Sequence, residues 1–211
     1  MEYPLVGKIA TYSYLIPVLT GIFIFKKLQR RGKIYFLFFV LNMFGVFIET
    51  VIANYHVNNQ WFINIFRTVE LLYFIELFSI WIPSSKVKMF SWVLFISFLI
   101  FSILNTHFFL DPNSINSSDE VFSNVIHIIL SGIILYYFVK DDLRSTLQDY
   151  RVLFASGILL YNAGIILIFA FSNTLLKMGM EYFDVAWHFN WSLTIIINVL
   201  FGYSIYIVSN D

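Results

Sequence analysis

The sequence predicts an all-α polytopic membrane protein, and three observations lead to that prediction. Hydrophobic residues make up 59% of the 211 residues, and charged residues make up only 12%, about half the share of an average soluble domain. The apolar residues are gathered in seven long stretches, each long enough to cross a bilayer as a helix. These stretches are continuous and do not alternate with polar residues, which favours helices over a transmembrane barrel.

The seven predicted spans fill most of the chain, so we expect a single transmembrane domain over residues 1–211 with no soluble domain. In chain order the predicted spans are 9–25, 34–55, 61–82, 89–109, 121–139, 152–173 and 186–209. The first precedes a strongly basic connection, the second carries Glu49, and the third carries Arg67 and Glu70. The fourth holds no Asp, Glu, Lys or Arg, the fifth carries His127, and the last two are apolar runs with scattered asparagines.

The basic residues predict the orientation, because short cytoplasmic loops retain Lys and Arg. Ten of them fall on one side of the membrane: Lys26, Lys27, Arg30, Arg31, Lys33, Lys86, Lys88, Lys140, Arg144 and Arg151. The other side has Lys8 and Lys177 and an acidic loop with Asp111, Asp119 and Glu120. We therefore expect the N-terminus outside and the C-terminus in the cytoplasm.

The charge balance and the absence of cysteine exclude several classes of function. Lys plus Arg and Asp plus Glu both number 13, so no net charge favours nucleic acid as a partner. A chain without cysteine has no disulfide, no thiolate metal site and no cysteine nucleophile. No phosphate-binding glycine loop or Gly-x-Ser-x-Gly motif is present, so an enzyme is not the leading expectation.

The first three spans can be aligned with the last three, which predicts a 3+1+3 parallel repeat with the fourth span as linker. The aligned residues of the second and sixth spans are Leu41, Gly45 and Asn54 with Leu160, Gly164 and Asn173. Those of the third and seventh are Trp61, Asn64 and Thr68 with Trp187, Asn190 and Thr194. Chance matches in so restricted a composition are the alternative.

The 3+1+3 plan with an outside N-terminus is similar to that of the sugar-transporter and opsin-like seven-helix proteins. A retinal pigment would need a lysine in the last span, and 186–209 has none. The sugar transporters carry a proline in the first helix of each repeat; Pro17 fits the first, but 121–139 has no proline.

The Trp-x-x-Asn-x-x-Arg-x-x-Glu opening of the third span and the Gly157-x-x-x-Tyr161 pattern carry a closer likeness. With them the chain resembles uncharacterised bacterial seven-helix inner-membrane proteins, which in turn resemble the membrane sensor modules of some histidine kinases. That resemblance implies sensing and a multi-pass inner-membrane location.

Polar residues inside the predicted spans are the candidate site, because ionisable groups are costly in a bilayer and face the bundle interior. The candidate ligand-binding residues lie in the outer halves of four spans: Glu49, Arg67, Glu70, His127, His188 and Asn190. Arg67 and Glu70 are three residues apart and can pair along one helix. Since one arginine cannot neutralise two glutamates, either Glu49 or Glu70 is protonated, or a histidine or bound cation supplies the missing charge. A purely structural network that fixes helix packing is the alternative.

Three functional hypotheses follow from this pattern. The first is a receptor-like or sensory protein whose outward pocket binds a small polar or amphipathic ligand, or a proton, and signals to a cytoplasmic partner protein. The second is a small-solute or proton-coupled transporter. The third is an intramembrane metal hydrolase, since Glu49, Glu70, His127 and His188 are of the types that bind zinc; an oligomeric pore or scaffold also stays open. Because the last span lacks a second histidine four residues from His188, we predict no cofactor.

Overall fold

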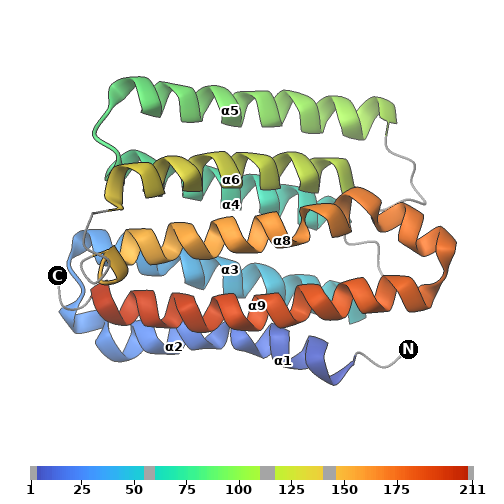
Figure 1. Cartoon of the computed structure of the whole chain (residues 1–211), viewed down its shortest axis with the longest axis horizontal. Helices are drawn as coiled ribbons and strands as arrows, with labels where there is room; N and C mark the ends of the chain where they lie inside the picture. Colours follow the sequence, from blue (N-terminus) through green and yellow to red (C-terminus); the bar gives the residue numbers. More distant parts are fainter. Residues whose placement is uncertain (1–3, 55–59, 110–116, 140–145, 209–211) are drawn as a thin grey trace.

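The computed structural model describes residues 4–54, 60–109, 117–139 and 146–208 and consists of long helices that run side by side (Figure 1). No strand occurs among the described residues. The prediction of an all-α polytopic membrane protein is therefore confirmed.

The described elements follow the predicted spans closely. The first span is divided into α1 (Leu5–Ser13), α2 (Leu15–Ile24) and the short 3-10 turn η1 (Phe25–Lys27). The others are α3 (Arg30–Asn54), α4 (Gln60–Trp81), α5 (Ser85–Leu104) with the π-helical turn η2 (Asn105–Phe109), α6 (Ser117–Phe138), α8 (Tyr150–Met178) and α9 (Met180–Val208).

The break in the first span lies at Tyr14, three residues before Pro17. A proline lacks the amide hydrogen that would bind the carbonyl four residues earlier, and its ring collides with that carbonyl. The carbonyl concerned is that of Ser13, the last residue of α1. The Ser13 side chain is bound by α9, because the Asn198 side chain donates a 2.8 Å hydrogen bond to the Ser13 hydroxyl.

Three predicted boundaries at the outer end, in the fifth, sixth and seventh spans, need correction. The helix α6 begins at Ser117, so Asp119 and Glu120 form its first turn and are buried, whereas the sequence pattern assigned them to an outer loop. The helices α8 and α9 extend toward each other until Gly179 alone separates them. Gly179 has a φ of 138°, a conformation that a residue with a side chain rarely adopts.

Among the described residues, six of the seven helical segments are long and apolar enough to cross a membrane. The exception is α4, which carries Arg67, Glu70 and Glu76. It nevertheless runs alongside the other helices (Figure 1), and much of its surface is covered by them, with Leu71, Phe74 and Phe78 fully buried. Contact with protein in place of lipid allows a helix to carry charges at this depth.

The helices form a closed ring in the order α1/α2, α3, α4, α6, α8 and α9, and α9 packs back against α1 and α2. The helix α5 lies outside this ring against α4 and α6 (Figure 1). This position agrees with its predicted role as a linker. At the aligned positions of the predicted repeat, Gly45 receives the ring of Phe66, and Gly164 receives Leu193. The repeat itself stays a prediction, because any six-membered ring can be divided into two such halves.

We name the two ends of the bundle after the predicted orientation. The outer end holds Leu5, Gln60 and Gly179; the inner end holds Arg30, Tyr150 and Val208, and most described Lys and Arg side chains lie there. The cations predicted at Lys140 and Arg144 lie outside the described residues.

The inner half of the ring is filled by large aromatic side chains. Phe154 of α8 is fully buried at its centre, and ring centroids lie 5.3 to 6.0 Å away in Tyr35, Phe38, Phe39, Phe74, Trp81 and Phe201. The hydroxyl of Tyr35 shares a 2.5 Å hydrogen bond with Ser204 of α9, and the Tyr73 hydroxyl donates to the backbone carbonyl of Ile34. These contacts join α3, α4, α8 and α9 into one dense layer.

Candidate functional site

The outer half of the ring encloses a cavity of about 340 Å³, within the size range of small-molecule sites. Side chains from α1, α3, α4, α6, α8 and α9 line it, so every segment of the ring contributes. Its lining includes charged and polar groups, whereas the layer beneath it is aromatic. The boundary lies at Phe74, whose ring centroid is 4.8 Å from that of His127.

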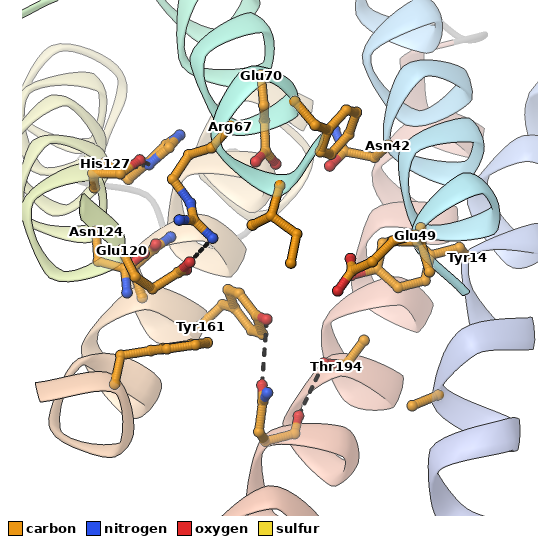
Figure 2. Close-up of a pocket in the computed structure, with 18 of the residues that line it drawn as sticks. Tyr14, Asn42, Glu49, Arg67, Glu70, Glu120, Asn124, His127, Tyr161 and Thr194 are labelled. Carbon is orange, nitrogen blue, oxygen red and sulfur yellow. Dashed lines mark hydrogen bonds and ion pairs between the residues drawn. The ribbon is translucent and has the colours of Figure 1, made fainter. Parts of the chain in front are cut away.

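Arg67 forms an ion pair across the cavity with Glu120 at the start of α6 (Figure 2). The two side chains are only 14% and 12% exposed. The sequence spacing also allowed Arg67 to pair with Glu70 on its own helix; the Arg67 charge acts on Glu70, but the bonded partner of Arg67 is Glu120. Glu120 is the better placed partner because α6 packs against α4, which brings the first turn of α6 to the level of Arg67.

Glu49 of α3 and Glu70 of α4 are therefore left without a bonded partner among the described residues. Neither has a hydrogen bond or ion pair with any other described residue, although the Arg67 charge acts on both. Figure 2 shows the two carboxylates directed into the same space from neighbouring helices. Within the described chain, the charged groups that line the cavity are three glutamates and one arginine, so negative charge is in excess when the glutamates are ionised.

His127 lies on the α6 wall and is 5% exposed. Its Nδ1 is 3.0 Å from the backbone carbonyl of Ser123, one turn earlier. A carbonyl can only accept, so this contact assigns the ring proton to Nδ1 and leaves Nε2 as an acceptor in the neutral ring.

The parts of the cavity wall formed by α6, α8 and α9 also carry neutral polar groups. The Tyr161 hydroxyl of α8 donates a 3.3 Å hydrogen bond to the side-chain oxygen of Asn190 on α9, and Thr194 donates to the backbone of the same asparagine. Asn124 of α6 is 3% exposed, and its side-chain nitrogen has no hydrogen-bond partner among the described residues. Such an unmatched buried donor is uncommon and costly.

Five of the six candidate residues predicted from the sequence line this cavity: Glu49, Arg67, Glu70, His127 and Asn190. His188 does not, because it is exposed on the outside of α9, where its Nδ1 meets the backbone carbonyl of Asp184. It follows Trp187 by one residue and is thus turned by about 100° from the face that lines the cavity. That the five residues bind a ligand stays a prediction.

The cavity does not bring metal ligands together within the described chain. No group of three His, Asp or Glu side chains there is close enough to hold a metal ion. Glu120 is bound to Arg67, and His188 points away, so the donor set expected for a zinc hydrolase is not assembled.

Sequence reasoning missed Glu120 and Tyr161. By helical spacing Asn124, His127 and Ser131 share one face of α6, and one further turn back along the same face reaches Glu120. The segment Ser117-Ser118-Asp119-Glu120 also has the composition of a helix start. Tyr161 stood out in the sequence only through the Gly157-x-x-x-Tyr161 pattern, which carries a resemblance and does not by itself indicate a site.

Searches with this chain against protein-family models, curated proteins and solved structures find no match.

Proposed function

We propose that this protein is a membrane sensor: its cavity binds a small ligand that enters from the outer end, and occupancy alters the inner end, where a cytoplasmic partner would respond. The observation that carries the proposal is the division of one bundle into a polar cavity in the outer half and a solid aromatic layer in the inner half. A closed inner half suits a protein that detects a ligand and retains it on one side.

The helix α8 offers a route between the two halves. Tyr161 and Asn162 line the cavity, Phe154 occupies the centre of the aromatic layer two turns away, and Arg151 lies at the inner end. Arg151 is held by two hydrogen bonds to Asp149 and stacks on the Phe138 ring at 3.8 Å from its centroid. A shift of α8 at the cavity would therefore disturb an ordered group at the inner end.

Signalling requires that the ligand bind one arrangement of the helices better than another, since equal affinity for both shifts nothing. The proposal can be tested without knowing the ligand. The chain has no cysteine, so Thr194→Cys introduces a single thiol into the cavity wall with little change of side-chain size. An uncharged benzyl methanethiosulfonate then serves as a covalent occupant.

We expect the adduct at Thr194→Cys to change amide hydrogen exchange at the inner end, in peptides that cover 25–33 and 82–90. The matched control is the same adduct at His188→Cys, on the exposed face of α9 and near the cavity in sequence; it should leave those peptides unchanged. Full modification of Thr194→Cys with unchanged exchange at the inner end would refute the sensor. No modification at all would refute access to the cavity.

Transport is the second candidate, because α3 and α4 of one predicted half and α8 and α9 of the other both line the cavity. A transporter must expose its site to both sides of the membrane in turn. Reaction of the Thr194→Cys cysteine with a reagent supplied from the inner side would favour transport. Reaction from the outer side alone favours the sensor.

A further inference from the structure

We infer that the cavity takes a small organic cation, an ammonium compound that also carries a hydrogen-bond acceptor. This inference rests on the proposed function, in which the cavity binds a ligand, and it adds the chemical class of that ligand. Four features of the described residues support it.

The first feature is charge. Arg67 is bonded to Glu120, and Glu49 and Glu70 face the cavity with no bonded partner among the described residues. The Arg67 charge acts on both, but one arginine does not balance three glutamates when these are ionised. Two carboxylates that share a confined space favour a bound positive charge, because attraction is strong where water is limited. An anionic ligand would meet the same two carboxylates and be repelled.

The second feature is the aromatic part of the wall. Rings from four segments line the cavity: Tyr14, Phe66, Tyr161, Phe169, Trp187 and Trp191. A cation is attracted to the face of an aromatic ring, and tryptophan is the most effective of these rings. Carboxylates combined with aromatic faces suit an alkylated or primary ammonium group, whose surface is partly apolar.

The third feature is the unmatched side-chain nitrogen of Asn124. Asn124 is almost completely buried and lies on the α6 wall, across the cavity from Glu49 (Figure 2). Its free donor would be satisfied by an oxygen of the ligand. A molecule with an ammonium group at one end and a hydroxyl, carbonyl or phosphate oxygen at the other would meet both sides of the cavity.

The fourth feature separates an organic cation from a metal ion. The described acidic side chains and His127 do not converge in threes around any point, whereas divalent metals require several close ligands. A cavity of about 340 Å³ is also far larger than a single ion needs. Its volume suits a compact organic molecule.

Two thiol reagents of opposite charge test this inference on Thr194→Cys in lipid nanodiscs. One is the cationic trimethylammonioethyl methanethiosulfonate, and the other is the anionic sulfonatoethyl methanethiosulfonate. The same thiolate attacks both reagents and displaces methanesulfinate from each, so the ratio of their rates cancels the reactivity of the thiol itself. The ratio is the rate with the cationic reagent divided by the rate with the anionic reagent. At Thr194→Cys we expect this ratio to be about tenfold or more above its value at the exposed His188→Cys control. Equal ratios at the two positions would overturn the inference while leaving the sensor proposal standing.

Charge-neutral substitutions locate the source of the preference. Glu49→Gln and Glu70→Gln together should bring the ratio at Thr194→Cys close to that of the control. Glu76→Gln is the matched control, because Glu76 lies on the same helix as Glu70 but is exposed and does not line the cavity; it should leave the ratio unchanged. A preference that survives the double substitution would contradict the role given to the two carboxylates.

Choline, which has both an ammonium group and a hydroxyl, tests reversible binding. It should slow modification of Thr194→Cys by the uncharged benzyl reagent, and its uncharged isostere, with carbon in place of nitrogen, should protect at least tenfold less well. Equal protection by the isostere would contradict a cation site.

The ammonium group could belong to a free amine or to the headgroup of a lipid such as phosphatidylethanolamine. Nanodiscs of phosphatidylglycerol alone, compared with nanodiscs that also contain phosphatidylethanolamine, distinguish these sources. Slower modification of Thr194→Cys in the second kind, with His188→Cys unaffected, would identify the headgroup as the occupant. Equal rates in the two, together with protection by choline, would identify a free amine.

Discussion

The outer and inner halves of this bundle are built from the same helices but use opposite means to fill the space between them. In the outer half, charged and amide side chains surround a cavity. In the inner half, aromatic rings pack around the fully buried Phe154, and the hydroxyl of Tyr35 is bound to Ser204. Since lipid offers no hydrophobic driving force between helices, dense packing in one half permits a loosely filled site in the other.

The largest loss of stability should come from a substitution that removes packing in the inner half. Phe154→Ala removes the ring at the centre of the aromatic layer and should lower the free energy of unfolding by about 3 kcal/mol, near the lower limit for such changes in soluble cores because lipid replaces water. Unfolding by sodium dodecyl sulfate in mixed micelles measures this loss. Phe171→Ala, which removes a 55% exposed ring of the same helix, is the control. Equal losses for the two variants would show that the inner half is not the stable region.

In the outer half, the free energy of unfolding should depend on the ion pair between Arg67 and Glu120. Arg67→Met leaves Glu120 largely buried without its partner and should cost about 2 kcal/mol of unfolding free energy, less than for a fully buried pair because the cavity adjoins it. Removing both partners in Arg67→Met/Glu120→Met should restore part of that loss. A double variant less stable than the sum of the two single variants would contradict this pairing.

A single hydrogen bond in the inner half should matter less than either of these changes. Tyr35→Phe removes the bond to Ser204 and keeps the ring, so we expect a loss of about 1 kcal/mol. Tyr136→Phe alters a tyrosine that is 85% exposed and should change nothing. The same unfolding assay compares them. A loss below the error of the assay for Tyr35→Phe would assign the stability of this layer to ring packing alone.

The smallest effect is expected at His188. Because it lies outside the cavity and is exposed, His188→Gln should change neither the unfolding free energy nor the rate at which the Thr194→Cys cysteine is modified. A clear change in that rate would show that His188 contributes to the cavity, contrary to its position on the exposed face of α9.

The sequence predicted the helices well because long apolar runs are a direct consequence of the bilayer thickness. It also placed Glu49, Arg67, Glu70 and His127 at one depth, since depth follows from counting along each span. Asn190 and Thr194 are four residues apart, so helical periodicity places them on one face, and both line the cavity.

What the sequence could not supply was the set of neighbours around each helix. Trp81 lies near the inner end of its predicted span, a position where tryptophan commonly meets the membrane interface, yet it is 6% exposed and packs against Tyr35 and Phe154. Glu120 was assigned to a loop because hydropathy locates the apolar part of a helix and not its polar first turn. The sequence offered Glu49 and Glu70 as partners of Arg67, whereas the structure pairs it with Glu120. That contact depends on the packing of α4 against α6 in the closed ring, which no sequence pattern specifies.

The most direct test of the account is the sidedness of the cavity. Thr194→Cys in proteoliposomes of uniform orientation would be treated with a membrane-impermeant thiol reagent from the outer or the inner side, with Ser204→Cys as the matched position in the inner half. We predict reaction of Thr194→Cys from the outer side alone and no reaction of Ser204→Cys from either side. Reaction of Thr194→Cys from the inner side, or of Ser204→Cys at a similar rate, would contradict the division into an open half and a closed half.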